Sequence, residues 1–100
     1  MNIPYDLLEA FKNRMHITHS GEDSNLERLL SFSIVAIKNS CGEFDIEDSK
    51  DTDLRAQELV LERTRYAYND ALEYFGDNFL SEITSLSLSL IPEGDTNETL

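Results

Sequence analysis

The sequence predicts an all-α fold, a small bundle of about four helices followed by an extended C-terminal segment. Through residues 1–84, apolar side chains recur at spacings of three and four, as they do on the buried face of a helix. From Ser85 the chain reads SLSLSLIPEG, and this period of two is typical of a β-strand. We therefore expect a helical bundle domain at residues 1–84 and an extended docking segment with a polar tail at residues 85–100.

The chain is strongly acidic, because 20 Asp and Glu residues against 8 Lys and Arg give a net charge of −12. Proteins bind nucleic acid mainly through Lys and Arg on its phosphates, so this balance argues against tight nucleic-acid binding. No apolar run approaches the roughly 20 residues that cross a bilayer, and we expect no membrane contact. The single cysteine excludes an internal disulfide.

The first two helices are predicted from their end signals. The first is expected to begin at Pro4, whose fixed φ suits a first turn. The second is expected to begin at a capping box, with Ser24 as N-cap and Glu27 reaching back to it. Phe32 is expected at the edge of the buried arc of this second helix. Gly42 is expected to end the helix in a left-handed conformation.

Residues 43–53, EFDIEDSKDTD, hold six acidic side chains and one lysine, which predicts an exposed loop that Phe44 and Ile46 attach to the body. Lys50 and Ala56 stand where a calcium loop requires glycine and glutamate, so we expect no calcium site. The acidic residues are candidates for a channel lining or a solvent-facing surface: Glu43, Asp45, Glu47, Asp48, Asp51 and Asp53.

The longest helix is expected from Leu54 to Phe75, with a short fourth helix near residues 77–84. Its apolar arc is wider than one small bundle requires, so part of it is expected to contact another chain. Arg63 and Asp70 lie seven residues apart, two turns along the same side of this helix. We interpret them as a partly buried ion pair or hydrogen-bonding group within the subunit, or else as a contact between subunits that sets the assembly geometry.

The sequence lacks the residue patterns of catalysis. His16 and His19 lie near Glu22 and Asp23, but no regular helix holds them and no second cluster completes a tetrahedral metal site. Cys41 lies on the apolar arc of its helix, where a small buried side chain is expected. There is no phosphate-binding glycine loop and no convincing nucleophile–base spacing. We therefore expect a protein that is not an enzyme and that holds neither metal nor cofactor.

The alternating C-terminal segment offers four candidate residues for binding a partner. A lone strand is not stable in water, because its backbone groups need a ladder. We expect the segment to pair with another chain, and the alternative is an extended strap over the chain's own helices. The candidate residues are Leu86, Leu88, Leu90 and Ile91.

Between residues 7 and 90 the chain contains, in this order, the stretches EDSNLERLL, ERTRYAYNDALEYF and NFLSEI. With the sequence around them, they resemble the head–tail connector (adaptor) proteins of long-tailed bacteriophages. More narrowly, they are similar to the short connectors of phages and prophages of Gram-positive bacteria, often labelled DNA-packaging proteins. None of the stretches is a catalytic motif, so the resemblance rests on extent and order.

The resemblance implies a subunit of the phage neck without enzymatic activity. Such subunits form a ring, twelvefold in the virion, beneath the portal protein and extend the DNA channel toward the stopper (head-completion) protein and the tail. The implied partners are the portal, neighbouring copies and the stopper, while DNA passes through without specific binding. The implied locations are the host cytoplasm during assembly and then the head–tail interface. The polar tail after Ile91 departs from the family pattern, because it is short for a portal-gripping arm.

A second class of function also fits the composition. A small acidic helical regulator or inhibitor would bind a basic protein partner through its charge, and a free strand could cap that partner by strand addition. A gene that follows portal and capsid genes would favour the connector, whereas a neighbouring toxin gene would favour the regulator.

Overall fold

The computed structural model describes residues 2–91, and all of their regular secondary structure is helical. The predicted all-α fold is thereby confirmed. The elements, in chain order, are α1 (Tyr5–Met15), α2 (Asp23–Cys41), α3 (Asp51–Tyr68), the 3₁₀ turn η1 (Leu72–Tyr74), α4 (Phe75–Asn78) and α5 (Leu80–Ser89).

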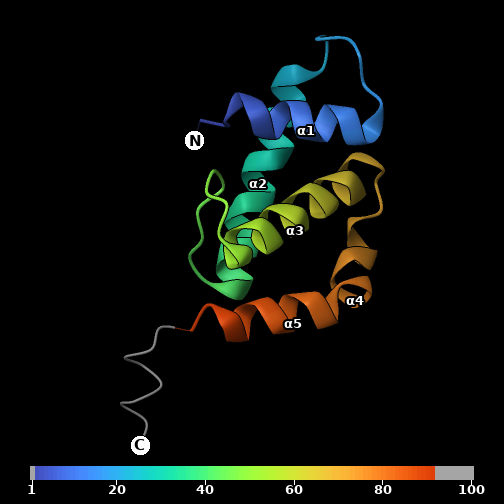
Figure 1. The fold of residues 1–100 in the computed structure, drawn as a ribbon. Coiled ribbons are helices and arrows are strands. Elements are labelled where there is room, and N and C mark those ends of the chain that lie inside the picture. Colours follow the sequence, from blue (N-terminus) through green and yellow to red (C-terminus); the bar gives the residue numbers. More distant parts are fainter. Residues whose placement is uncertain (1, 92–100) are drawn as a thin grey trace, which may run out of the picture.

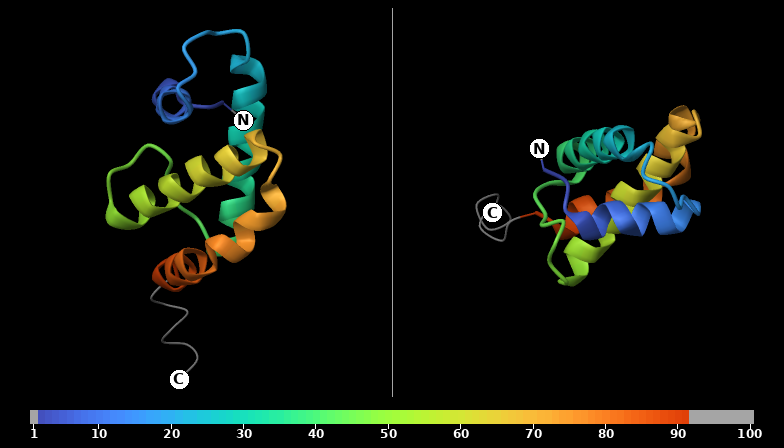
Figure 2. Two further views of the ribbon diagram at one scale, coloured as in Figure 1. Left: turned by 90° about the vertical axis from the view of Figure 1, so that its right-hand side faces the viewer. Right: turned by 90° about the horizontal axis from the view of Figure 1, so that it is seen from above.

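Helix α2 is the central element, and α1, α3 and α5 lie across it one below another (Figure 1). In the side view, α1 is seen end-on near one end of α2 and α5 is strongly foreshortened near the other, with α3 between them (Figure 2). The apolar core follows this arrangement, because each crossing helix buries one face against α2. The largest fully buried apolar side chains are Phe11, Leu26, Leu30, Ile34, Ile37, Val60 and Leu86.

The interface between α2 and α3 also contains a buried polar pair. The hydroxyls of Ser33 and Thr64 are fully buried and hydrogen-bond to each other at 2.9 Å. The Thr64 hydroxyl also lies 2.7 Å from the Val60 carbonyl one turn back along α3. Because both hydroxyls have partners, their burial does not carry the full cost of an unsatisfied polar group.

The two ends of α2 agree only in part with the predictions. The capping box at Ser24 is wrong, since α2 begins at Asp23 and no side chain caps it. The neighbouring acidic residues are engaged elsewhere: Asp23 pairs with Lys12, and Glu22 accepts a hydrogen bond from a tyrosine of α3. The C-terminal end is confirmed, because α2 stops at Gly42, whose φ of 118° and ψ of −176° are open almost only to glycine.

The long helix predicted to reach Phe75 ends at Tyr68. Asp70 takes up a left-handed conformation with φ of 60°, and the Ala71 amide donates to the Tyr66 carbonyl at 2.8 Å. This is the closure of a Schellman motif, in which asparagine or aspartate can stand for glycine. The apolar pattern runs on through the break: Phe75 of α4 is buried in the core, whereas Leu72 and Tyr74 of η1 are exposed.

The prediction of an extended C-terminal segment is also wrong, because residues 85–89 belong to helix α5. The predicted boundary between the bundle and this segment, after residue 84, falls inside that helix. Leu86 is fully buried and Ile83 packs against the core, three residues away on the same helical face. Burying this face against α2 and α3 outweighs the weak preference of an alternating serine–leucine pattern for a strand. The polar tail at residues 92–100 lies outside the described residues.

Candidate interaction surfaces

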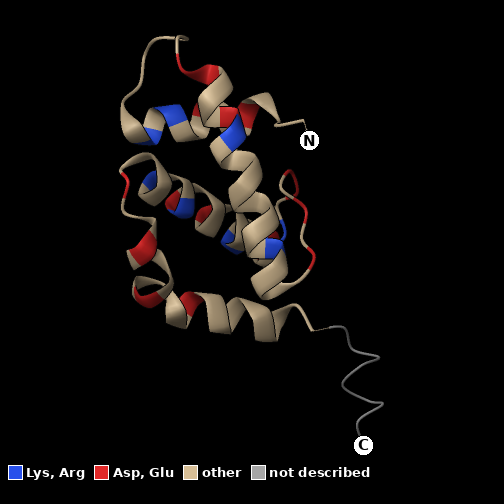
Figure 3. Cartoon of the chain, turned by 180° about the vertical axis from the view of Figure 1, so that it is seen from behind, with Lys and Arg blue, Asp and Glu red and all other residues tan. Residues whose placement is uncertain are grey.

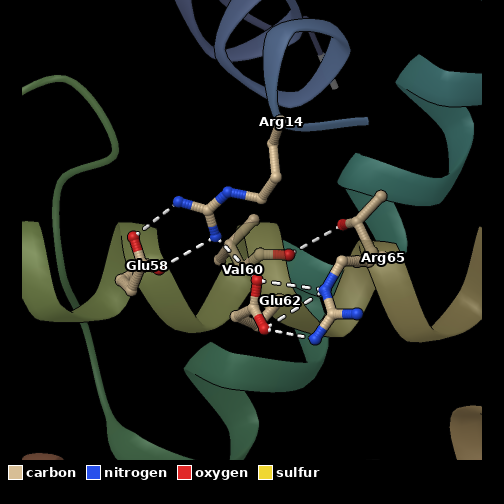
Figure 4. A network of polar contacts seen from close by, with 6 residues as sticks. Arg14, Glu58, Val60, Glu62 and Arg65 are labelled. Carbon is tan, nitrogen blue, oxygen red and sulfur yellow. Dashed lines mark hydrogen bonds and ion pairs between the residues drawn. The ribbon is translucent and has the colours of Figure 1, made fainter. Parts of the chain in front are cut away.

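A charged network joins α1 to α3 (Figure 4). Arg14 contacts Glu58 with both guanidinium nitrogens, at 2.8 and 2.9 Å, and reaches Glu62 at 2.8 Å. Arg65, one turn along α3, contacts Glu62 at 2.8 Å. Glu62 therefore bridges two guanidinium groups, and this α1–α3 network fixes the C-terminal end of α1 against the middle of α3.

The network shifts the pKa values of Arg14, Glu62 and Arg65 in the expected directions. The hydrogen bond from Arg65 has the largest effect on the pKa of Glu62. Together with a weaker effect of the hydrogen bond from Arg14, it lowers this pKa below its ordinary value although burial opposes the shift. The carboxylate of Glu58 raises the pKa of Arg14. The Glu62 carboxylate and the guanidinium groups of Arg14 and Arg65 therefore stabilise one another's charged forms in a partly desolvated place.

Two further contacts tie α1 and α3 to the start of α2. Lys12, which is buried along its stem, reaches Asp23 at 2.8 Å. The hydroxyl of Tyr68 donates to Glu22 at 2.9 Å, and its ring meets the Phe11 ring edge-on, with centroids 6.2 Å apart. The α1 end of the bundle is thus held by several charged groups.

The inner face of α5 is attached differently. Its apolar side chains join the core, and its polar contacts to α3 come from Arg55, which donates to Ser85 at 2.9 Å and Ser89 at 3.2 Å. Leu90, just beyond α5, lies against Gly42, where an added Cβ would sit 3.4 Å from the Leu90 Cβ. These contacts leave the opposite side of the helix uncovered.

That opposite side is an exposed and uncharged strip, which we call the α5 outer face. It consists of Leu80, Thr84, Leu88 and Ile91, spaced four, four and three residues apart. Leu80 and Leu88 are 62% and 64% exposed. Figure 3 shows α5 almost without charge, since Glu82 is its one charged residue.

The helix divides the four predicted docking residues into two groups. Leu86 is fully buried and Leu90 is partly buried against the core, so these two stabilise the chain itself. Leu88 and Ile91 are exposed and remain candidates for a partner. The sequence placed the three leucines on one face because it treated the segment as a strand with period two.

A second exposed apolar surface lies between α2 and the end of α3. This α2–α3 groove has a volume of about 360 Å³ and contains no acidic residue. Phe32, expected at the edge of the buried arc, is 55% exposed, and Val35 is 46% exposed beside it. The residues that line the groove are Leu29, Phe32, Val35, Ala36, Asn39, Arg63, Ala67 and Leu72.

Two arginines at the groove lack a carboxylate partner within residues 2–91. The Arg28 guanidinium lies over the Phe32 ring, 5.3 Å from its centroid. Arg63 donates to the Ser33 hydroxyl at 3.2 Å, and burial lowers its pKa. Every other Lys and Arg except Lys50 pairs with an Asp or Glu.

The predicted pairing of Arg63 with Asp70 is wrong as an ion pair of one helix. Asp70 lies beyond the end of α3, in the left-handed turn, and is exposed. The break in the helix removes the two-turn spacing that would have placed it above Arg63. Ser33, from α2, takes its place as the hydrogen-bond partner of Arg63.

The acidic loop is folded onto the start of α3. Phe44 is buried in the core and Ile46 packs against it, which confirms the predicted attachment. Asp53 is also buried, and its carboxylate accepts the Asp45 amide at 2.9 Å. The Gln57 side chain donates to two loop carbonyls. The remaining five acidic candidates are exposed: Glu43, Asp45, Glu47, Asp48 and Asp51.

Within residues 2–91, no three His, Cys, Asp or Glu side chains are grouped so that they could hold a metal ion. His16 lies just past the end of α1, and His19 lies 3.7 Å from Glu22. Cys41 is buried, its thiol faces the Ile83 carbonyl at 3.6 Å, and burial raises its pKa. None of the described helices is long and apolar enough to cross a bilayer.

Comparisons of the chain with family models, with curated proteins and with solved structures found no match. The candidate surfaces are therefore argued from the geometry above. Sequence reasoning missed the α2–α3 groove, although the pattern contained one signal. Phe32 and Val35 lie on the side of α2 opposite to Leu30 and Ile37, which the structure buries.

Proposed function

We propose that the protein is a structural subunit of a phage neck, where copies form a ring beneath the portal and extend the DNA channel toward the stopper protein and the tail. The proposal takes the function from the resemblance of residues 7–90 to head–tail connectors. It takes structural support from the exposed surfaces of the folded chain.

The observation that carries the proposal is the presence of two different exposed apolar faces on one small acidic chain. The α5 outer face and the α2–α3 groove share no residue and lie on different elements. A subunit of a closed ring needs two such faces, because each copy contacts its two neighbours through unlike surfaces. Phe32, Leu80 and Leu88 are each more than half exposed, and adjoining exposed apolar side chains of this kind are typical of interaction sites.

The charge of the chain agrees with this role. Five carboxylates of the acidic loop project into solvent, and the chain as a whole carries −12. A negatively charged wall repels the DNA phosphates, so a strand that moves past it is not held. We propose the acidic loop as a surface that faces either the channel or the outside of the ring.

The proposal is tested by mixing the purified chain with a portal protein from the same genome and imaging the mixture by negative-stain electron microscopy. The expected result is added ring density under the portal that is absent from the portal alone. A Leu80→Asp, Leu88→Asp double variant should lose this density, and Leu54→Asp, which alters an exposed leucine outside both faces, should retain it. A portal without added density at saturating chain concentration would contradict the proposal.

The exposed loop carboxylates also support the second class, an acidic regulator that binds a basic protein. Strand addition no longer belongs to this alternative, because the segment expected to supply the strand is helical. A regulator would use the loop and not the apolar faces. Reversal of Glu47 and Asp48 to lysine would then abolish its binding, whereas the same change should leave ring density under the portal intact.

A further inference from the structure

We infer that the α5 outer face of one copy packs into the α2–α3 groove of a second copy, with Asp77 of the first copy meeting Arg63 of the second. The contact joins unlike surfaces and is therefore head to tail. The inference deepens the proposed function and rests on it for the biological setting, since it names which faces neighbouring copies share.

Charge is distributed along the chain in a way that favours this contact. From Phe75 to Ile91, the segment that carries the α5 outer face, the chain contains two acidic residues, Asp77 and Glu82, and no Lys or Arg. Asp70 and Glu73 lie on either side of Leu72 in the sequence, at the rim of the groove. From Arg28 to Gly42, which covers the α2 side of the groove, it contains two basic residues and no acid. Two copies that both carry −12 repel each other in most orientations, but this orientation places acidic residues against basic ones.

The apolar parts of the two surfaces also match in length and kind. The strip from Leu80 to Ile91 is about 16 Å long at the helical rise of 1.5 Å per residue, and the groove along α2 from Leu29 to Asn39 is about 15 Å long. Both surfaces expose aliphatic or aromatic side chains without an acid–base pair of their own. A helix laid in a groove between two helices is a common mode of recognition.

Arg63 identifies the charged contact. It lines the groove and is half-buried, and no carboxylate within residues 2–91 pairs with it. A partly desolvated guanidinium gains more from a carboxylate than an exposed one does. Asp77 is exposed and lies in α4, three residues before Leu80, where α5 and its outer face begin.

The test measures self-association of the full chain by sedimentation velocity from micromolar to millimolar concentration. Arg63→Glu and Asp77→Lys are each expected to weaken association by about tenfold or more, because each places like charges together. The two changes combined in one chain, or an equimolar mixture of the two single variants, should restore it. Lys50→Glu and Glu47→Lys are the matched controls, since they change net charge equally at exposed sites outside both faces.

Arg63 also contacts Ser33, so circular dichroism and thermal melting must show that Arg63→Glu folds. If it does not, Phe32→Asp and Leu88→Asp replace it, because both side chains are more than half exposed. These two variants should each lose association, and Leu54→Asp should keep it.

Three outcomes would overturn the inference. The wild-type chain could fail to associate at millimolar concentration, or both Arg63→Glu and Asp77→Lys could associate as strongly as wild type. The third outcome is that each single variant loses association and the combined variant does not regain it. Ring density under the portal combined with any of these would leave the neck function standing and reject only this contact. If the combined charge reversal restores association but no ring density forms at the portal, the contact between copies would stand and the neck function would be rejected.

Discussion

The two ends of the bundle are held by different forces. At the α1 end, Arg14, Glu58, Glu62 and Arg65 form a charged network across the α1–α3 interface. At the α5 end the contacts are apolar, with Arg55 donating to serine hydroxyls. Ion pairs respond to pH and salt, whereas apolar contacts respond mainly to the volume that is filled. The two ends should therefore differ in what loosens them.

This difference also explains where the exposed surfaces lie. The α1 end uses much of the positive charge of an acidic chain within the subunit. The α5 end uses little charge, and its outer face remains uncharged and open to a partner. The predictions below ask whether the two ends depend on charge and packing as the contacts indicate.

The largest expected effect is at the apolar end. Leu86→Ala removes a fully buried side chain from the contact of α5 with α2 and α3, and it should lower the free energy of unfolding by about 3 kcal/mol. Leu88→Ala, two residues away on the exposed side, should change it by less than about 0.5 kcal/mol. Urea unfolding followed by circular dichroism measures both. Equal losses would mean that α5 is not held by its inner face.

A smaller effect is expected at the charged end. Glu62→Gln leaves two guanidinium groups without their shared carboxylate and should cost about 2 kcal/mol at pH 7. Glu58→Gln, at the exposed side of the same network, should cost less. Urea unfolding of wild type, Glu62→Gln and Glu58→Gln gives the comparison. An unchanged free energy of unfolding in Glu62→Gln would mean that the charged network does not hold the α1 end.

The loss in Glu62→Gln should also depend on pH in a defined direction. The folded pKa of Glu62 lies below its ordinary value of 4.5, so its contribution is complete above that value and disappears as the pH falls through the folded pKa. The difference in unfolding free energy between wild type and Glu62→Gln should therefore shrink below pH 4.5. The deficit of Leu86→Ala should persist over the same range.

The smallest effect concerns the single arginine that contacts α5. Arg55→Met removes its hydrogen bonds to Ser85 and Ser89 and should cost about 0.5 to 1 kcal/mol. Amide hydrogen exchange should rise in α5 and stay unchanged in α1. Lys50→Met is the control, since Lys50 has no ion pair within residues 2–91. Faster exchange in α1 would show that the two ends are not independent.

The sequence predicted the helices most reliably where a strong stop signal coincides with the end of the apolar pattern. Gly42 ended α2 as expected, because its conformation is closed to other residues. The break after Tyr68 was missed because Asn69 and Asp70 are weaker stop signals and the apolar pattern continues through them. Of the candidate docking residues, Leu88 and Ile91 are exposed while Leu86 and Leu90 are not, so partner contact stays a prediction for the first two.

The sequence by itself determined the all-α class, the acidic surface and the residues available for the core, because helical period and charge are local properties of the chain. Only the tertiary structure decided that residues 85–89 are helical, that Arg63 faces Ser33 and that Phe32 is exposed. Each of these three features depends on which pairs of helices pack together. That choice is made by burying apolar area against distant elements, and its free energy exceeds the small conformational preferences of short segments.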